Sequence, residues 1–171
     1  MKTYRDNNGD LHREDGPAVI YPDGTQEWFY KGWQHREDGP AIIRANGDQF
    51  WLWYGRCHRS DGPAVISSSG AQQWWIHGKL HRTDGPAVEY EDGTREWWVN
   101  GKRHRTDGPA LIHSDGTREW FLHGGRHRLD GPAMIRPMIT EWHVNGKCHR
   151  TDGPAVILNN GTQQWWVNGK L

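Results

Sequence analysis

Three side chains that could support acid–base chemistry recur through this chain at one fixed spacing. They stand, for example, at His104, Arg105 and Asp107, inside the phrase His-Arg-x-Asp-Gly-Pro-Ala. In a hydrolytic interpretation, His104 is a general base oriented by Asp107, and Arg105 stabilises developing negative charge. The phrase occurs seven times, and no serine or cysteine nucleophile recurs beside the histidine. The copies start at His12, His35, His58, His81, His104, His127 and His149.

Seven equivalent copies favour a structural role over catalysis. An active site needs one well-placed constellation, whereas a repeat array needs the same contacts in every unit. We therefore expect no catalytic residue, and the chain is predicted not to be an enzyme. The residues expected to form a structural ladder are Trp97, His104, Arg105, Asp107, Gly108 and Pro109.

Metal and phosphate chemistry are not expected either. Zinc needs several ligands within about 2.0–2.3 Å of one ion, whereas the repeated histidines should lie about 9.6 Å apart if each repeat adds two strands. There is no Cys-x-x-Cys or His-x-x-x-His pair, and His77, His113, His123 and His143 fall in different slots of the repeat. The glycines are single turn residues rather than a phosphate-binding loop. We expect no metal and no cofactor.

Composition argues against two classes of partner. The 171 residues include 21 basic and 21 acidic side chains, so there is no basic footprint for duplex nucleic acid. No run of 18 apolar residues is present to span a membrane, and the first residues lack the apolar segment of a signal peptide. Cys57 and Cys148 are expected to be free thiols, which suits a cytoplasmic location.

The elements that position these residues are predicted by two turn signals in each repeat. Asn-Gly and Asp-Gly pairs between apolar runs indicate hairpins, because a tight primed turn needs positive φ. Turns every 10–13 residues leave room only for short antiparallel strands, and no segment has helical periodicity. We predict an all-β fold, an elongated antiparallel β-meander or solenoid of seven hairpin repeats of about 23 residues, with about fourteen strands in one domain, 1–171.

Alternation within each repeat separates two aromatic rows. The leading position is tryptophan in all seven repeats, and it shares a strand face, expected to be buried, with the residue two positions on. The position between them points the other way and is still mostly apolar. Because monomers seldom expose a large apolar stripe, this second row is a candidate binding surface; alternatively, the bent repeat folds it inside. The second row is Phe29, Leu52, Trp75, Trp98, Phe121, His143 and Trp166.

The repeat pattern also predicts one bend and one irregular loop. Proline cannot donate to a sheet, so each unit should bend at Asp-Gly-Pro, with glycine supplying a permissive backbone. In the sixth repeat the glycine turn is missing, and a distorted loop is expected at Met138 and Ile139. These two residues, with Leu52 and His143, are further candidates for specific contacts.

The two ends of the chain differ from the repeats. Residues 1–11 are expected to form a polar cap half-unit before the seven repeats of 12–171. Counting back 23 from Trp28 and Phe29 lands on the charged Arg5 and Asp6; a frayed terminus is the alternative. The last repeat stops without a return strand, and the open edge from Thr162 on could pair with a second copy as a homodimer.

The phrase Trp-x-x-Asn-Gly-Lys-x-His-Arg, followed by an Asp-Gly turn, resembles a MORN-type repeat. The His-Arg-x-Asp-x-Pro-Ala element is closer to a divergent variant found in proteins of giant viruses and bacteriophages. The resemblance covers nearly the whole chain and implies stacked hairpins in a curved sheet that acts as a scaffold. The usual His-Gly-x-Gly is replaced here and no basic stripe is present, so lipid binding is not expected.

These observations predict a non-enzymatic repeat scaffold or binding protein that engages a protein partner through its aromatic or irregular-repeat surface. By resemblance the source is viral or phage, which would make the partner a host factor, such as a defence protein, in the host cytoplasm. The alternative is a small-ligand binder whose aromatic row takes a carbohydrate or a nucleotide.

Overall fold

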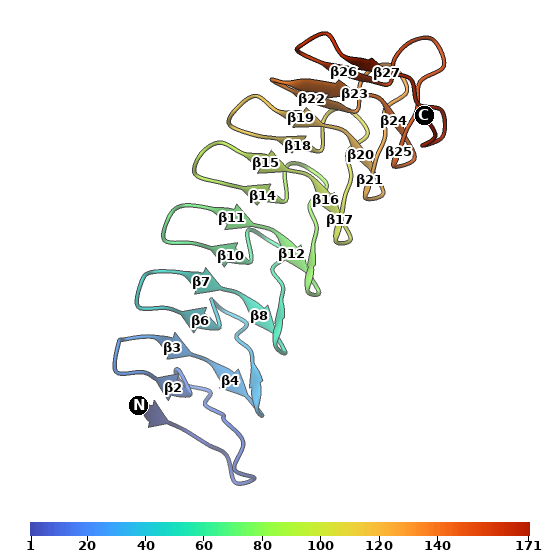
Figure 1. Cartoon of the computed structure of the whole chain (residues 1–171). Helices are drawn as coiled ribbons and strands as arrows, with labels where there is room; N and C mark the ends of the chain where they lie inside the picture. The colour runs from blue at the N-terminus through green and yellow to red at the C-terminus, as the bar shows by residue number, and fades with distance from the viewer. The chain divides into compact units, whose positions relative to one another are not determined.

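The structure is a computed structural model that describes residues 1–171, and it contains strands and turns without any helix. The predicted all-β antiparallel meander of hairpin repeats is confirmed (Figure 1). Backbone contacts group the chain into two units, Met1–His81 and Arg82–Leu171. The single-domain boundaries stay a prediction. No helix is present that could span a membrane.

In the first unit, consecutive main-sheet strands pair antiparallel in chain order. These strands are β1 (Lys2–Thr3), β2 (Val19–Ile20), β3 (Gln26–Glu27), β6 (Ile42–Ile43), β7 (Gln49–Phe50), β10 (Val65–Ile66) and β11 (Gln72–Gln73). Three small hairpins alternate with them along the chain. They are β4 (Phe29–Tyr30) with β5 (Trp33–Gln34), β8 (Leu52–Trp53) with β9 (Arg56–Cys57), and β12 (Trp75–Ile76) with β13 (Lys79–Leu80).

The second unit repeats this arrangement. Its main-sheet strands are β14 (Val88–Glu89), β15 (Arg95–Glu96), β18 (Leu111–Ile112), β19 (Arg118–Glu119), β22 (Met134–Arg136), β23 (Ile139–Glu141), β26 (Val156–Leu158) and β27 (Gln163–Gln164). Its hairpins are β16 (Trp98–Val99) with β17 (Lys102–Arg103), β20 (Phe121–Leu122) with β21 (Gly125–Arg126), and β24 (His143–Val144) with β25 (Lys147–Cys148).

Each repeat has more strands than predicted because the chain changes hydrogen-bond partner at the leading tryptophan. The N–H of Trp97 donates to the carbonyl of Ala110 beside the main sheet, with N···O 2.8 Å. The carbonyl of Trp97 instead accepts the N–H of His104, at 3.0 Å, in its own small hairpin. The strand therefore breaks at this residue, which gives 27 short strands rather than about fourteen.

The small hairpins close with the primed turns expected from the sequence. The first turn residue has a positive φ, from 45° at Tyr54 to 54° at Asn168, and a glycine of positive φ follows. The main-sheet turns differ. At Asp92-Gly93 only the glycine has positive φ, and the carboxylate of Asp92 accepts the N–H of Thr94 at 2.8 Å. For these turns the primed prediction is wrong, because a type I turn followed by a left-handed glycine closes the loop.

The expected bend at Asp-Gly-Pro is present, at residues 106–108 for example. The role predicted for its glycine is wrong, since Gly108 does not have a positive φ. A Cβ atom at Gly108 would lie 3.1 Å from Cζ of Arg105. The glycine therefore leaves room for the guanidinium group that packs on it.

The cap half-unit retains an aromatic residue that counting missed. Tyr4 donates its N–H to the carbonyl of Ala18 at 2.8 Å, and the guanidinium carbon of Arg13 lies 4.0 Å from its ring centroid. These are the contacts that a leading tryptophan makes in the repeats. Counting back 23 reached Arg5 because the segment from Tyr4 to His12 is one residue longer than its equivalents.

The sixth repeat has no distorted loop, so that prediction is wrong. Arg136 pairs with Ile139 across a tight turn at 137–138, and β22 and β23 each gain a third residue. Proline fixes φ near the value that the first position of a tight turn requires, which replaces the missing glycine. Met138 is exposed and Ile139 is half-buried.

The alanines after each proline form the most buried row of the chain. All seven are 0% exposed, and large apolar side chains such as Val88, Leu111 and Met134 follow them. The leading tryptophans were expected to be buried, yet six are half-buried and Trp165 is 57% exposed. Arginine side chains lie over the rings of five of them: Trp28, Trp51, Trp97, Trp120 and Trp142.

Candidate binding surface

The repeated histidines hold the hairpin turns in place. Nδ1 of His104 accepts the backbone N–H of His123 at 3.1 Å, which orders a turn residue of positive φ. Because Nδ1 is the acceptor, the neutral ring carries its proton on Nε2. The same contact is made by His12, His35, His58, His127 and His149.

The repeated arginines join three parts of each repeat. Nε of Arg105 donates to Asp107 at 2.9 Å, Nη1 donates to the carbonyl of Pro109 at 3.2 Å, and Cζ lies 4.1 Å from the ring centroid of Trp97. Hydrogen bonding and charge from Arg105 hold the pKa of Asp107 below its ordinary value of 3.8. Asp107 thus contacts Arg105 instead of orienting His104, and the hydrolytic constellation is not assembled.

The second aromatic row does not form an open stripe. Phe29, Trp75, Trp98, Phe121 and Trp166 are half-buried, while Leu52 and His143 are only 6% and 8% exposed. Three of the indole N–H groups donate within the row's own face, as Trp98 does to Glu96 at 2.7 Å. The second row therefore fits the alternative in which the bent repeat encloses it better than the alternative of an exposed apolar stripe. A binding role for the row stays a prediction.

Three of the five exposed aromatic side chains lie on the first two hairpins, whereas Tyr90 and Trp165 are exposed in the second unit. Trp33, Trp53 and Tyr54 are 59%, 40% and 44% exposed, and the half-buried Tyr30 lies beside them. We call these four residues the unit 1 aromatic surface. The ring of Trp53 meets that of Tyr54 edge-on at 5.5 Å, and Tyr30 approaches Tyr54 at 6.5 Å. The ladder residue His35 stacks on Tyr54 at 4.4 Å, which fixes the tyrosine.

Grooves run along this surface. A groove of about 750 Å³ is lined by Tyr30, His35 and Tyr54 together with the loops at 13–16 and 36–38. A smaller one, about 330 Å³, lies among Trp33, Trp53 and Tyr54. Aromatic walls with a few polar groups are typical of binding grooves.

An excess of acidic side chains borders the larger groove. Asp15 and Asp38 are paired with Arg13 and Arg36. The carboxylates of Glu14 and Glu37 lie 3.6 and 3.7 Å from Nε2 of His12 and His35, and their side chains are 81% and 77% exposed. Only the first two repeats carry glutamate in this slot, which elsewhere holds Ser60, Thr83, Thr106, Leu129 and Thr151.

Sequence reasoning missed the unit 1 aromatic surface because it followed the regular rows. Trp33 occupies a slot that holds lysine, arginine or glycine in the other repeats. Tyr54 occupies a turn position of positive φ, where asparagine is favoured and a bulky residue is an outlier. A slot-by-slot comparison of the repeats would have found both departures.

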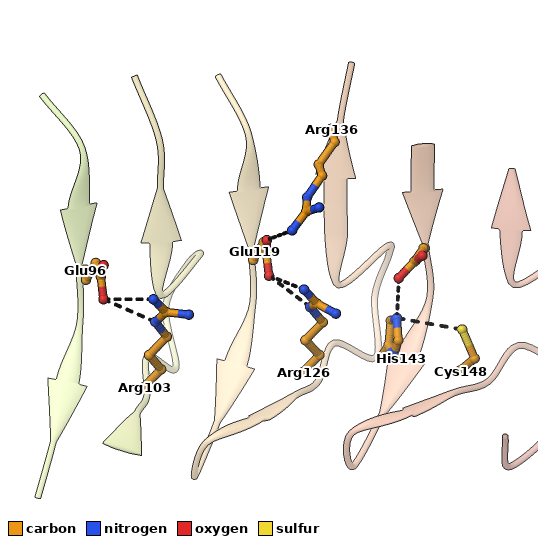
Figure 2. Close-up of polar contacts among 8 residues, drawn as sticks. Glu96, Arg103, Glu119, Arg126, Arg136, His143 and Cys148 are labelled. Atoms are coloured by element: carbon orange, nitrogen blue, oxygen red, sulfur yellow. Dashed lines mark hydrogen bonds and ion pairs between the residues drawn. The ribbon is translucent and has the colours of Figure 1, made fainter. Parts of the chain in front are cut away.

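Polar clusters lie along the face of β15, β19 and β23 in the second unit (Figure 2). Glu119 is buried, and its carboxylate accepts from Arg136 at 2.6 Å and from Arg126 at 2.9 Å. Burial raises the pKa of Glu119, but hydrogen bonds from Arg136 and Arg126 outweigh it and hold the pKa below 4.5. In the preceding repeat Glu96 pairs with Arg103 at 3.1 Å.

The next repeat holds a different set, Glu141, His143 and Cys148, whose ligand atoms lie within 4.8 Å of one another. His143 was expected to lie apart from other metal-ligand residues, but the hairpin register pairs it with Cys148. A two-residue turn at 145–146 fixes that register, so the spacing of five residues was the available signal. Burial, followed by the charge of Glu141, raises the pKa of the Cys148 thiol, which makes it a poor nucleophile at neutral pH.

A scan against protein-family models and a search of curated proteins found no match to this chain. The resemblance to MORN-type repeats therefore stays a hypothesis drawn from the repeat phrase.

Proposed function

We propose that the chain is a non-enzymatic binding protein that engages a protein partner through the unit 1 aromatic surface. The observation that carries the proposal is the exposure of Trp33, Trp53 and Tyr54 next to one another on two adjacent hairpins. Tryptophan and tyrosine dominate the binding energy of protein interfaces, because they bury much area for little loss of conformational freedom.

The residues that recur in every repeat support a binding role over catalysis. The histidine, arginine and aspartate of the ladder are engaged in turn, ring and loop contacts of their own repeats. The residues that differ between repeats are therefore the ones available for a specific task.

The border of the surface favours a partner with a basic segment. Glu14 and Glu37 lie along the groove that Tyr30 and Tyr54 line. An arginine or lysine of the partner would lie against an aromatic ring and pair with a carboxylate there. Because the repeat resembles a variant found in giant-virus and phage proteins, we expect the partner to be a host protein and binding to occur in the host cytoplasm.

A second candidate is a small ligand, such as a carbohydrate or a nucleotide. The larger groove, at about 750 Å³, lies within the range of small-molecule sites, and its aromatic rings could stack on a sugar or a base. The protein partner is preferred because Trp33, the most exposed ring, lies outside this groove.

The test uses changes that the repeats themselves supply. Trp33→Lys and Tyr54→Asn place in the first two hairpins the residues found at Lys102 and Asn100. The double variant should fold normally and lose a partner that the unaltered chain captures from host lysate. The matched control is His123→Asn, which makes the same turn substitution in the second unit and should retain the partner.

Capture of the same proteins by the double variant would contradict the proposal. Titration of the purified chain with sugars and nucleotides, followed by tryptophan fluorescence, separates the second candidate. A saturable shift that the double variant loses would favour the small ligand.

A further inference from the structure

The cluster of Glu141, His143 and Cys148 directs three different metal-ligand types at one point. Nε2 of His143 lies 2.7 Å from a carboxylate oxygen of Glu141 and 3.7 Å from the sulfur of Cys148. The three residues come from β23, β24 and β25, and Figure 2 shows both contacts meeting at the same ring nitrogen. The imidazole is buried, at 8% exposure, so its position is fixed by the fold.

The other repeats show that this set is a coordinated departure. In the fifth repeat the same three slots hold Glu119, Phe121 and Arg126, and the glutamate is neutralised by arginine. The sixth repeat keeps the glutamate but replaces both the aromatic residue and the arginine, by histidine and cysteine. In the second repeat, by contrast, Cys57 faces Leu52 across its hairpin. The cysteine slot alone therefore does not require histidine.

The geometry does not fit a cysteine–histidine–carboxylate catalytic group. In such a group the carboxylate contacts one ring nitrogen and the nucleophile contacts the other. Here Glu141 and Cys148 both approach Nε2, while Nδ1 of His143 is buried and makes no hydrogen bond. Nitrogen, sulfur and oxygen donors within 4.8 Å of one another are instead the kind of ligand set that a metal ion takes.

We propose that Glu141, His143 and Cys148 bind a zinc ion through a carboxylate oxygen, Nε2 and Sγ, with a fourth position open to water or an outside ligand. Zinc–ligand bonds of about 2.0–2.3 Å imply donor separations of about 3.3–3.7 Å. The nitrogen–sulfur distance of 3.7 Å already meets this range. The nitrogen–oxygen distance of 2.7 Å must open by about 0.6 Å as the metal displaces the hydrogen bond. The carboxylate oxygen and the sulfur, which lie within 4.8 Å of each other, must come into the same range.

The proton balance of binding follows from the same contacts. The thiol of Cys148 loses its proton to solvent when the sulfur coordinates, since the thiolate is the ligand. Coordination through Nε2 places the ring proton on Nδ1, which is buried without a hydrogen-bond partner. The nearby Arg126 and Arg136 form their ion pairs with Glu119, and Arg136 also interacts electrostatically with Glu141.

The experiment titrates the purified full chain with cobalt(II), which replaces zinc in such sites and reports thiolate coordination by its absorption. The expected result is one equivalent bound, with a sulfur-to-cobalt charge-transfer band that zinc abolishes by displacement. His143→Phe, the residue of the fifth repeat, and Cys148→Ser should each remove the band and weaken zinc binding by about 100-fold or more. Cys57→Ser is the matched control and should leave both unchanged.

Near-ultraviolet circular dichroism checks that each variant is folded, and Cys148→Ala serves if Cys148→Ser is not. Absence of the band from the unaltered chain, its loss in Cys57→Ser, or its persistence in folded Cys148→Ser or Cys148→Ala would overturn the proposal. The outcome is independent of the partner test, since the aromatic residues changed there belong to the other unit.

Discussion

The buried Glu119 should tolerate its own replacement better than the loss of its arginines. Its side chain is 3% exposed, whereas those of Arg126 and Arg136 are 33% and 44% exposed. In Glu119→Gln the two guanidinium groups can recover water, so we expect a loss of about 1 kcal/mol in the free energy of unfolding. In Arg126→Leu/Arg136→Leu the carboxylate is left buried without a cation, at a cost of about 3 kcal/mol.

The pH dependence separates these two cases further. In the native chain the pKa of Glu119 is lowered, so its contribution is present above the ordinary value of 4.5 and is lost as the pH falls. In the double variant burial alone remains and raises the pKa, so the cost is full at neutral pH and disappears as the carboxylate takes up a proton. The difference between the two proteins should therefore shrink from pH 7 to pH 4.

Urea unfolding followed by tryptophan fluorescence measures both effects, with Arg95→Leu/Arg118→Leu as the control for removing two exposed positive charges from the same unit. Leucine is acceptable in the Arg126 slot, since Leu80 occupies it in the third repeat. The reasoning is refuted if the double variant loses no more stability than Glu119→Gln, or if its loss is the same at pH 7 and pH 4.

Three further predictions concern the ladder. Burial, and after it the neighbouring imidazole of His77 or His123, lowers the pKa of His58 and His104 below 6.5. As the pH falls, these histidines take up protons in the unfolded chain before they do so in the folded chain, so thermal stability should fall below about pH 6.5. Calorimetry at constant ionic strength checks this trend. Arg105→Ala should lower the free energy of unfolding by about 1–2 kcal/mol in urea titrations, because it removes two hydrogen bonds and the ring contact with Trp97. Gly108→Ala should lower the free energy of unfolding, because the new Cβ atom displaces the Arg105 guanidinium. In urea titrations, adding Gly108→Ala to the Arg105→Ala variant should cost less free energy than adding it to the unaltered chain.

Local signals predicted the hairpins well, because a turn depends on a few neighbouring residues. Local signals did not predict the strand break at each leading tryptophan, because it depends on hydrogen bonds to two different partners. The N–H of Trp97 donates to Ala110, whereas its carbonyl accepts from His104. Tyr4 was missed for a related reason: one extra residue in the first hairpin shifts the count without changing the contacts. Hydrogen-bond partners, rather than residue spacing, define the repeat at these places.

The candidate surfaces were harder to predict than the fold. Alternation separates two faces of a strand but does not say what covers each face. Here arginines such as Arg105 cover the leading tryptophans, and the second row is largely enclosed. Trp33 and Tyr54, whose rings are exposed, differ in residue type from the residues in the same slots of the other repeats. The same is true of the cluster that contains His143 and Cys148.

The backbone at Tyr54 gives a physical reason to look for function at such departures. A φ of 45° is costly for a bulky residue, and asparagine fills the same turn position at Asn100, Asn145 and Asn168. Contacts with the rings of His35, Trp53 and Tyr30 offset part of that cost, and the tyrosine remains 44% exposed. Histidine fills the same position at His77 and His123, where its ring packs on a ladder histidine as that of Tyr54 does. The strained turn and the exposed part of the ring support the proposed contact of Tyr54 with a partner.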